Sequence, residues 1–213
     1  MKTIQFGLIG LFLLFGGSSQ AQELKYGAEI GVDISKPQFS DYSTSKGCYC
    51  GTWANSDYYA MPSANINGYI ELKVNNLWGI SSEPGFIVKD GYLSPTYPQK
   101  KSEKMYVYNN YIQIPVLLNF YIKDKLFFSI GPELAFFTNS VIHKQSNEIF
   151  GYPYGINTFE VSGLIGAGYS INDHIDLGLR YSHGLTDIIQ SPPKIQYGNL
   201  YNQYLQLFVR YKK

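Results

Sequence analysis

The stretch Tyr111-Ile-Gln-Ile-Pro-Val-Leu-Leu-Asn-Phe-Tyr121 alternates between two kinds of side chain. One set of alternate positions is entirely apolar: Ile112, Ile114, Val116, Leu118 and Phe120. The other set is mostly polar or amphipathic: Tyr111, Gln113, Pro115, Leu117, Asn119 and Tyr121. Because a β-strand sends successive side chains to opposite faces, the stretch predicts a strand with one apolar and one mostly polar face. A soluble barrel would turn the apolar face inward, whereas a membrane barrel turns it outward to lipid.

Segments of this kind recur along the chain and are joined alternately by long and short connectors. The predicted strands are 24–34, 63–73, 78–88, 109–121, 126–137, 159–169, 174–185 and 203–211. The short connectors are 74–77, 122–125 and 170–173, and the long ones are 35–62, 89–108, 138–158 and 186–202. Strict alternation puts every long connector at one end. The sequence therefore predicts an all-β fold, an eight-stranded antiparallel up-and-down transmembrane β-barrel with short periplasmic turns and long extracellular loops.

The predicted outward positions carry no charge, as a lipid-facing wall requires. Beyond the strand quoted above they include Tyr26, Ala28, Ile30, Val32, Ile66, Ile70, Leu72, Phe128, Ile130, Leu134, Phe136, Phe159, Val161, Ile165, Tyr169, Ile175, Leu177, Leu179, Tyr181, Leu205, Leu207, Val209 and Tyr211. Aromatic side chains near the periplasmic strand ends predict an interfacial girdle made of Tyr26, Trp78, Tyr121, Tyr169 and Tyr211.

The predicted inward positions collect the charges. They are Glu29, Asp33, Glu71, Glu83, Glu133, Glu160, Asp176, Arg180 and Arg210, and the last two are the only arginines in the chain. By strand depth, Arg180 should lie near Glu29 and Glu83, and Arg210 near Asp176 and Glu71. The interior of an eight-stranded barrel is just wide enough to be filled by side chains. We therefore predict a structural ionic network of Glu29, Glu71, Glu83, Asp176, Arg180 and Arg210 that plugs the lumen; a gated narrow pore is the alternative.

The first residues predict export. Lys2 precedes the uncharged apolar run 6–15, and small residues up to Ala21 suit cleavage. We interpret 1–21 as a signal peptide and 22–213 as one barrel domain. No later stretch has the roughly 18 uninterrupted apolar residues of a spanning helix. A mature chain in a membrane must then be a closed barrel.

Composition excludes several functions. The net charge is +1, and no basic run exceeds Lys100-Lys101, so nothing indicates nucleic-acid binding. Charged residues make up 15% of the chain, against about 25% in ordinary soluble domains. Gly163, Gly166, Gly168 and Gly178 lie within predicted strands, where no helix could present amides to a phosphate, so no nucleotide cofactor is expected.

The remaining chemistry-bearing residues do not form a recognisable active site. Cys48 and Cys50 flank one residue, so they are either a strained disulfide or free thiols, and two ligands are too few for a closed zinc site. Ser182 and His183 lie near Asp187, but as neighbours in a strand they point to opposite faces. We therefore expect no catalytic, metal or cofactor site.

Four motifs resemble the PorT-type outer-membrane β-barrel family of Bacteroidetes-like bacteria. They are Tyr111-Ile-Gln-Ile-Pro-Val-Leu-Leu118, Gly131-Pro-Glu133, and Leu177-Gly-Leu-Arg-Tyr-Ser-His-Gly-Leu-Thr186, with Gly163-Leu-Ile-Gly-Ala-Gly-Tyr169 between the last two. The resemblance implies an eight-stranded barrel in the outer membrane of a Gram-negative bacterium, and little about activity.

Three kinds of function are consistent with the sequence. The first is a non-enzymatic integral outer-membrane barrel with a plugged lumen. Its loops, which are rich in Tyr and include Trp53, either contact another cell-envelope protein or shield the barrel. The second is a small pore or a protein-secretion accessory. The third is a secreted soluble barrel that binds an apolar ligand, which would invert the two faces of every strand.

Overall fold

The computed structural model describes residues 23–40, 56–95, 105–123, 125–144, 155–190 and 199–213. Within them the strands are β1 Glu23–Ser35, β2 Gln38–Ser40, β3 Ser56–Tyr59, β4 Met61–Lys73, β5 Trp78–Ser82, β6 Gly85–Pro95, β7 Met105–Ile122, β8 Leu126–Lys144, β9 Phe159–Ser170, β10 Ile175–Gly184, β11 Asn199–Tyr201 and β12 Gln203–Lys212. None of the described residues belongs to a helix long and apolar enough to cross a membrane.

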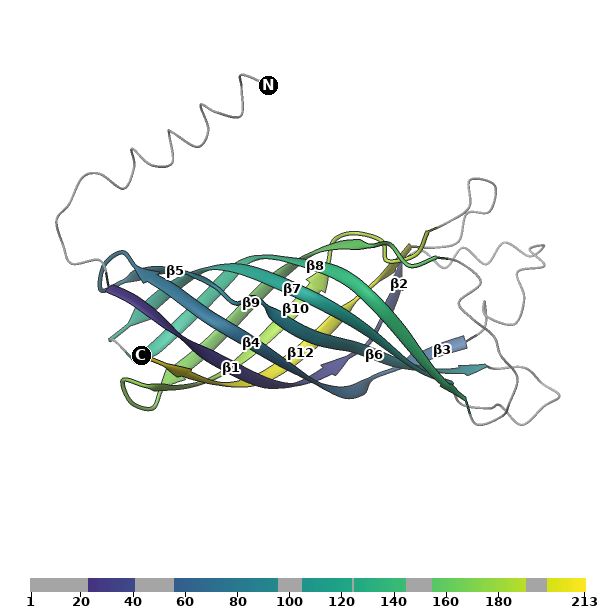
Figure 1. Cartoon of the computed structure of the whole chain (residues 1–213), viewed down its shortest axis with the longest axis horizontal. Helices are drawn as coiled ribbons and strands as arrows, with labels where there is room; N and C mark the ends of the chain where they lie inside the picture. Colours follow the sequence, from purple (N-terminus) through teal and green to yellow (C-terminus); the bar gives the residue numbers. More distant parts are fainter. Residues whose placement is uncertain (1–22, 41–55, 96–104, 124, 145–154, 191–198) are drawn as a thin grey trace, which may run out of the picture.

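The strands close into a tilted cylinder (Figure 1). Going round the wall, β1 pairs with β4, β4 with β5 and β6, and these with β7; then follow β8, β9, β10 and β12, which returns to β1. Every pairing is antiparallel. β5 and β6 lie end to end and occupy one strand position in the ring. The ring therefore has eight strand positions, which confirms the predicted eight-stranded antiparallel barrel.

The predicted short connectors are tight turns at one end of the cylinder, where the C-terminus also lies (Figure 1). In two of them an asparagine holds the turn. Asn75 Oδ1 accepts the amides of Leu77 at 2.8 Å and Trp78 at 2.9 Å. Asn172 Oδ1 does the same for His174 and Ile175, both at 2.9 Å. Such bonds to the local backbone are why Asn favours turns.

The third predicted strand, 78–88, is divided into β5 and β6 around Glu83 and Pro84. Pro84 has no N–H to donate, and neither does Pro115 on the facing strand β7. The register does not shift across the break, since Ser82 pairs with Val116 and Gly85 with Gln113. The interruption therefore leaves the alternation of faces unchanged.

The wall is taller on one side than the sequence predicts. β7 begins at Met105 rather than 109, β8 continues to Lys144 rather than 137, and β6 continues to Pro95 rather than 88. The short strand β3 pairs with the top of β6. Parts of the predicted long loops are thus sheet, because their Tyr and Val residues, such as Val107 paired with Ile142, continue the ladder. Two other pieces of the predicted loops, β2 and β11, pair with each other.

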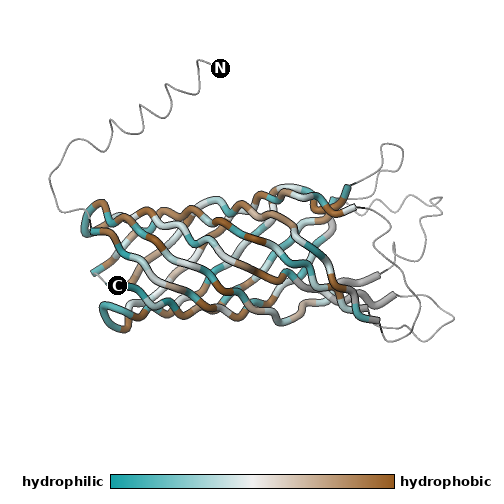
Figure 2. The backbone as a smooth tube through the Cα atoms, viewed as in Figure 1, coloured by the Kyte–Doolittle hydropathy of each residue, from teal (hydrophilic) through white to brown (hydrophobic). Residues whose placement is uncertain are grey.

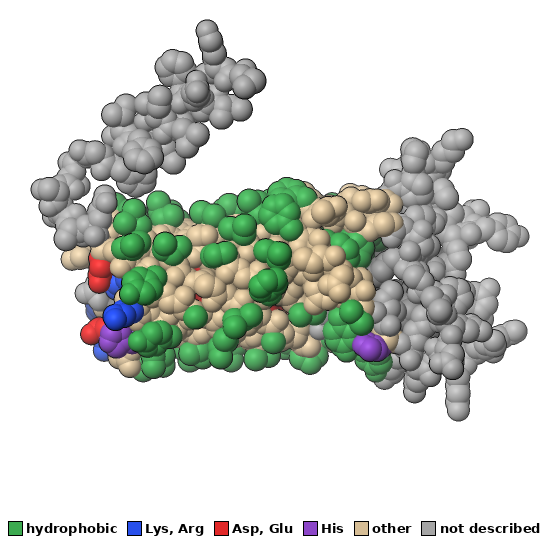
Figure 3. Space-filling model, viewed as in Figure 1, with side chains coloured by type: hydrophobic (Ala, Val, Ile, Leu, Met, Phe, Trp, Pro, Cys, Tyr) green, Lys and Arg blue, Asp and Glu red, His purple; other side chains and the backbone are tan. Residues whose placement is uncertain are grey.

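The apolar faces point outward. Along β1, β4, β10 and β12 the burial pattern alternates strictly for most of the strand, with apolar side chains exposed and polar ones buried. The same alternation is visible as bands of hydropathy along the strands (Figure 2). Hydrophobic side chains cover the visible wall, while charged ones gather at the turn end (Figure 3). The soluble alternative needs the opposite arrangement, so the structure excludes it.

The predicted aromatic girdle is wrong for one residue, Tyr121. Tyr26, Trp78, Tyr169 and Tyr211 point outward near the turn end and are 40–56% exposed. Tyr121 is 4% exposed and points into the lumen. Strand parity decides this, because Tyr121 shares its face with the inward positions of β7 and not with the apolar set.

Candidate functional site in the barrel lumen

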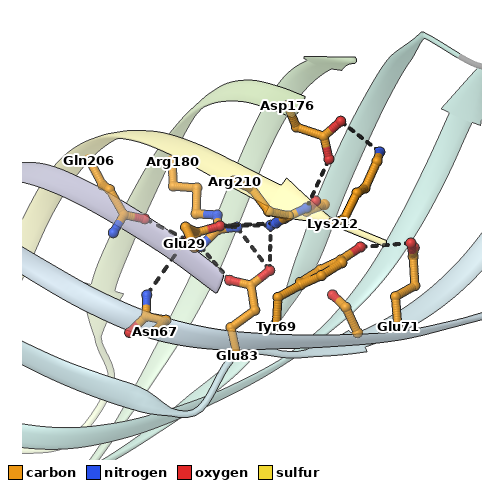
Figure 4. Close-up of polar contacts among 12 residues, drawn as sticks. Glu29, Asn67, Tyr69, Glu71, Glu83, Asp176, Arg180, Gln206, Arg210 and Lys212 are labelled. Atoms are coloured by element: carbon orange, nitrogen blue, oxygen red, sulfur yellow. Dashed lines mark hydrogen bonds and ion pairs between the residues drawn. The ribbon is translucent and has the colours of Figure 1, made fainter. Parts of the chain in front are cut away.

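Four charged side chains meet at the middle of the lumen (Figure 4). Arg180 forms a two-point contact with Glu29, with Nη1 2.7 Å from Oε1 and Nη2 2.9 Å from Oε2. Arg210 Nη2 lies 2.9 Å from Glu29 Oε2 and 2.6 Å from Glu83 Oε1. Arg180 Nη1 lies 2.5 Å from Glu83 Oε2. All four residues are at most 2% exposed, so two arginines and two carboxylates form a closed, electrically neutral cluster.

Strand register puts these residues together. Glu29 on β1 pairs directly with Arg210 on β12, which pairs with Asp176 on β10. Arg180 lies four residues after Asp176 and pairs with Gln206. Arginine suits such a cluster because its planar fork bonds carboxylates at two points and keeps its charge when dehydrated. The sequence placed Arg180 with Glu29 and Glu83, and the structure has the same three residues in contact.

Aromatic rings and glycines shape the space around the cluster. The guanidinium of Arg180 lies 4.0 Å from the ring centre of Phe208, and that of Arg210 lies 4.0 Å from the ring centre of Tyr69. The ring of Phe208 lies over Gly178, where an added Cβ would be 2.2 Å from its Cζ. Gly178 is therefore required for space, not as part of a nucleotide loop.

Asp176 links the cluster to the periplasmic end. It lies 3.6 Å from Arg210 Nη1 and 2.6 Å from Lys212 Nζ, and it accepts a bond of 2.7 Å from Ser170. Lys212 was missed by the sequence analysis because the last predicted strand stopped at 211. One more residue of alternation places this lysine on the inward face.

Glu71 takes a different place from the one predicted. It accepts hydrogen bonds from the hydroxyls of Tyr69 at 2.6 Å and Tyr121 at 2.5 Å and from Asn119 Nδ2 at 2.9 Å. Arg210 was expected near Glu71 and Asp176. It forms ion pairs with Glu29, Glu83 and Asp176, and its guanidinium lies over the ring of Tyr69, whose hydroxyl bonds Glu71. Three neutral donors, not a cation, satisfy the Glu71 carboxylate.

A second ionic cluster fills the extracellular half of the lumen. Lys89 Nζ lies 3.0 Å from Glu133 Oε1 and 3.1 Å from Glu160 Oε1. Tyr204 donates its hydroxyl to Glu133, and Asn202 Nδ2 donates to Glu160 at 2.8 Å. All five side chains are buried. Lys89 was missed because the sequence placed it in a loop, one residue beyond a predicted strand end.

Amide side chains surround the first cluster and bond the neighbouring carboxylates. Asn65 Nδ2 donates to both oxygens of Asp33, at 2.9 and 2.7 Å. Asn67 Nδ2 donates to Glu29 at 3.3 Å, and Gln113 donates to Asn67 at 3.0 Å. Polar side chains of the described strands thus fill the lumen at successive depths, from Asp176 near the periplasm to Glu160 near the outside.

The other residues weighed from the sequence do not join this network into an active site. Ser182 is buried in the lumen, while His183 is exposed on the outer wall. Asp187 Oδ1 accepts the amides of Ile189 and Leu200, both at 3.0 Å, and so orders the backbone above β10. Among the described residues no group of three or more His, Cys, Asp or Glu could hold a metal ion. Cys48 and Cys50 lie outside the described residues.

Solved outer-membrane proteins have similar structures at low sequence identity. Neisserial surface protein A is 11% identical, with a TM-score of 0.48, over 90% of this chain and 99% of that one. The outer membrane protein OprG from Pseudomonas aeruginosa is 12% identical, with a TM-score of 0.46, over 91% and 97%. The attachment invasion locus protein Ail of Yersinia pestis, solved with a heparin analogue, is 12% identical, with a TM-score of 0.44, over 90% and 99%.

Sequence comparison identifies the family. Among curated proteins no sequence matches this chain. The profile of the family described as "Outer membrane protein beta-barrel domain" matches residues 19–190. Most of the barrel wall lies within this range, from β1 to the end of β10. The chain therefore belongs to the outer membrane protein beta-barrel domain family and is an integral β-barrel of the outer membrane.

Proposed function

We propose that this protein is a non-enzymatic structural barrel whose lumen is plugged by its ionic network and whose outer loops are its working surface. The observation that carries the proposal is the pair of buried clusters around Arg180 and Lys89. Together they cross the lumen at two depths with side chains at most 2% exposed.

The bonding within the plug favours a structural role over conduction. A charge that guides permeating ions needs contact with water, because permeation requires binding that is weak enough to reverse. Here Glu29 is bonded by both arginines and Glu133 by Lys89 and Tyr204. Opening a path would separate buried opposite charges, which is costly in a low dielectric.

Within its family the chain is best described as a PorT-type barrel of Bacteroidetes-like bacteria, exported by the signal peptide 1–21. The motifs that resemble this family support the proposal, and several of their residues have structural roles in the barrel. Arg180 of the strand Leu177–Thr186 is in the plug, and Thr186 Oγ1 accepts the amide of Val161 at 2.9 Å where β10 ends. In the motif Tyr111–Leu118, the ring centre of Tyr111 lies 5.0 Å from Lys89 Nζ. The mass of the mature protein tests the export step, with cleavage expected next to Ala21.

The partners we propose are the surrounding lipid and, through the extracellular loops, another cell-envelope protein. The taller wall of β3, β6, β7 and β8 supports this, because it carries the chain beyond the height of β10 and β12 as ordered sheet. Exposed side chains such as Val141, 40% exposed, and Tyr59, 42% exposed, lie on this extension. Cross-linking in intact cells should capture one partner with the full barrel and lose it when residues 96–104 are shortened.

Planar bilayer recording tests the plugged lumen. The purified wild-type barrel should give no steady conductance above that of the lipid alone. The variant Arg180→Ala combined with Lys89→Ala removes one cation from each cluster and is the positive control for an opened lumen. Steady unitary currents from the wild-type barrel, abolished by heat denaturation, would contradict the proposal and favour the pore.

A further inference from the structure

The outer wall changes chemistry where β10 and β12 reach the extracellular end. Below this level the outward residues are apolar, such as Leu179, 49% exposed, and Leu205, 44% exposed. Above it the next outward positions are Tyr181 and His183 on β10 and Gln203 on β12. We call Tyr181, His183, Tyr201, Gln203 and Lys36 the rim patch.

The rim patch is held together by hydrogen bonds and ring stacking. Tyr181 Oη donates to Gln203 Oε1 at 3.0 Å and lies 3.2 Å from His183 Nδ1. The imidazole ring is stacked between two tyrosines, with ring centres 6.3 Å from Tyr181 and 6.4 Å from Tyr201 and interplanar angles of 27° and 21°. Aromatic faces and amide groups in this arrangement present a flat, ordered surface.

The hydrogen bonds within the rim patch leave one imidazole nitrogen of His183 available to a ligand. Tyr181 Oη donates to Gln203 Oε1 and shares a second hydrogen bond with His183 Nδ1, so Nδ1 is engaged within the rim patch. Nε2 is then the nitrogen outside this chain of bonds. An N–H at this position is a hydrogen-bond donor suited to an anion.

A lysine adds positive charge to the same surface. The backbone N of Lys36 donates to the carbonyl of Gln203 at 2.9 Å, so the two residues are neighbours across β1 and β12. The Lys36 side chain is exposed on the face that also carries Ile34. Of the acidic residues near the rim patch along the chain, Asp33 is buried in the lumen and bonded by Asn65, and Asp187 accepts the amides of Ile189 and Leu200. The rim patch is therefore cationic and rich in donors.

The height of the patch matches a lipid headgroup. Gln203 and Tyr211 lie on the outward face of β12, eight residues apart, and Tyr211 belongs to the periplasmic girdle. With about 3.3 Å per residue and a tilt of about 40°, that separation is roughly 20 Å along the membrane normal. The apolar band of such barrels is about 25 Å tall. A separation of roughly 20 Å from the periplasmic girdle therefore places the rim patch close to the outer edge of this apolar band.

We propose that the rim patch binds the phosphorylated sugar headgroup of an outer-leaflet glycolipid. Lys36 and His183 Nε2 would bond the phosphate, the tyrosine rings would lie against the sugar, and Leu179 and Leu205 would contact the acyl chains. Basic pockets at membrane interfaces bind anionic headgroups by the same chemistry.

Titration with defined lipids tests this site. The refolded full-length barrel in detergent is titrated with bis-phosphorylated lipid A, and bound lipid is counted by native mass spectrometry. The double variant Lys36→Ala/His183→Ala should bind about tenfold more weakly, since it loses charge-assisted hydrogen bonds to phosphate. Wild-type protein should bind the dephosphorylated lipid about as weakly as the variant binds the intact one.

The periplasmic end supplies a matched control. There His174 is stacked on Tyr211, with ring centres 6.1 Å apart, and His174→Ala should leave lipid A binding unchanged. Each variant is first shown to keep heat-modifiable gel mobility, which reports the folded barrel. Equal binding by the double variant and the wild type, or equal loss with His174→Ala, would overturn the proposal. So would displacement of lipid A by millimolar inorganic phosphate, because the site would then recognise the anion alone.

Discussion

Arg180 and Glu29 lie 151 residues apart in the sequence, yet two nitrogens of the arginine contact both oxygens of the carboxylate. The strand β12 lies between their strands in the wall. This contact therefore ties the first strand of the barrel to one near its end, and it forms only when the ring has closed. Closure of the sheet and formation of the Arg180–Glu29 contact are therefore coupled.

Replacing Arg180 with Ala should lower the free energy of unfolding by about 3–5 kcal/mol, because Glu29 and Glu83 lose a shared cation inside the barrel. The stability of Arg180→Lys should fall between those of the wild type and Arg180→Ala, since lysine keeps the charge but loses the two-point geometry. Urea unfolding in lipid vesicles, read by heat-modifiable gel mobility, measures both. Lys213→Ala, an exposed position, is the control. If Arg180→Ala were as stable as Lys213→Ala, the plug would not stabilise the barrel.

Replacing Lys89 with Met should also cost about 3–5 kcal/mol, because Glu133 and Glu160 share this one ammonium group. The double variant Lys89→Met/Glu160→Gln should be less destabilised than Lys89→Met, because it leaves one unpaired carboxylate instead of two. The same unfolding assay at neutral pH compares them. If the double variant were the less stable of the two, Lys89 would not be the charge that compensates Glu160.

The alternation of side chains predicted the wall well for a physical reason. Side chains alternate with a period of two residues along every strand, and a lipid-facing surface tolerates no charge. Which positions of a strand face outward is therefore unambiguous. Register then follows from short turns such as that of Asn172. This is why Arg180, Glu29 and Glu83 could be brought together from the sequence alone.

The strand ends were less predictable, and the missed residues lie there. Lys89 and Lys212 each come one residue after a predicted end, where alternation has too few positions left to be read. Tyr121 was misplaced because aromatic residues near a strand end suit both the interface and the lumen, and only parity distinguishes them. The upper parts of β6, β7 and β8 are stabilised by pairing with one another, and the alternation within one short segment does not show how far that pairing continues.

Gly178→Ala should destabilise the barrel by about 1–3 kcal/mol, because the new methyl group would overlap the ring of Phe208. Gly163→Ala is the matched control on the neighbouring strand. Its added Cβ would meet nothing closer than Leu185 Cδ1 at 3.9 Å, so the barrel should accept it. Combining Gly178→Ala with Phe208→Leu should restore part of the loss. Equal stability of the two alanine variants would show that the ring moves aside without cost.

Tyr121→Phe separates the lumenal role of this tyrosine from the interfacial one. Its hydroxyl donates to Glu71, whose other donors are Tyr69 and Asn119, so the variant leaves a buried carboxylate with one bond fewer. Hydrogen bonds to charged groups contribute about 1.5–3 kcal/mol, and a loss of that size is expected in the urea assay. Tyr211→Phe removes a hydroxyl from an outward ring, 56% exposed, and should change stability by less than about 0.5 kcal/mol. Equal effects at the two positions would mean that the Glu71 carboxylate is satisfied without Tyr121, and that this end of the lumen is held by apolar packing instead.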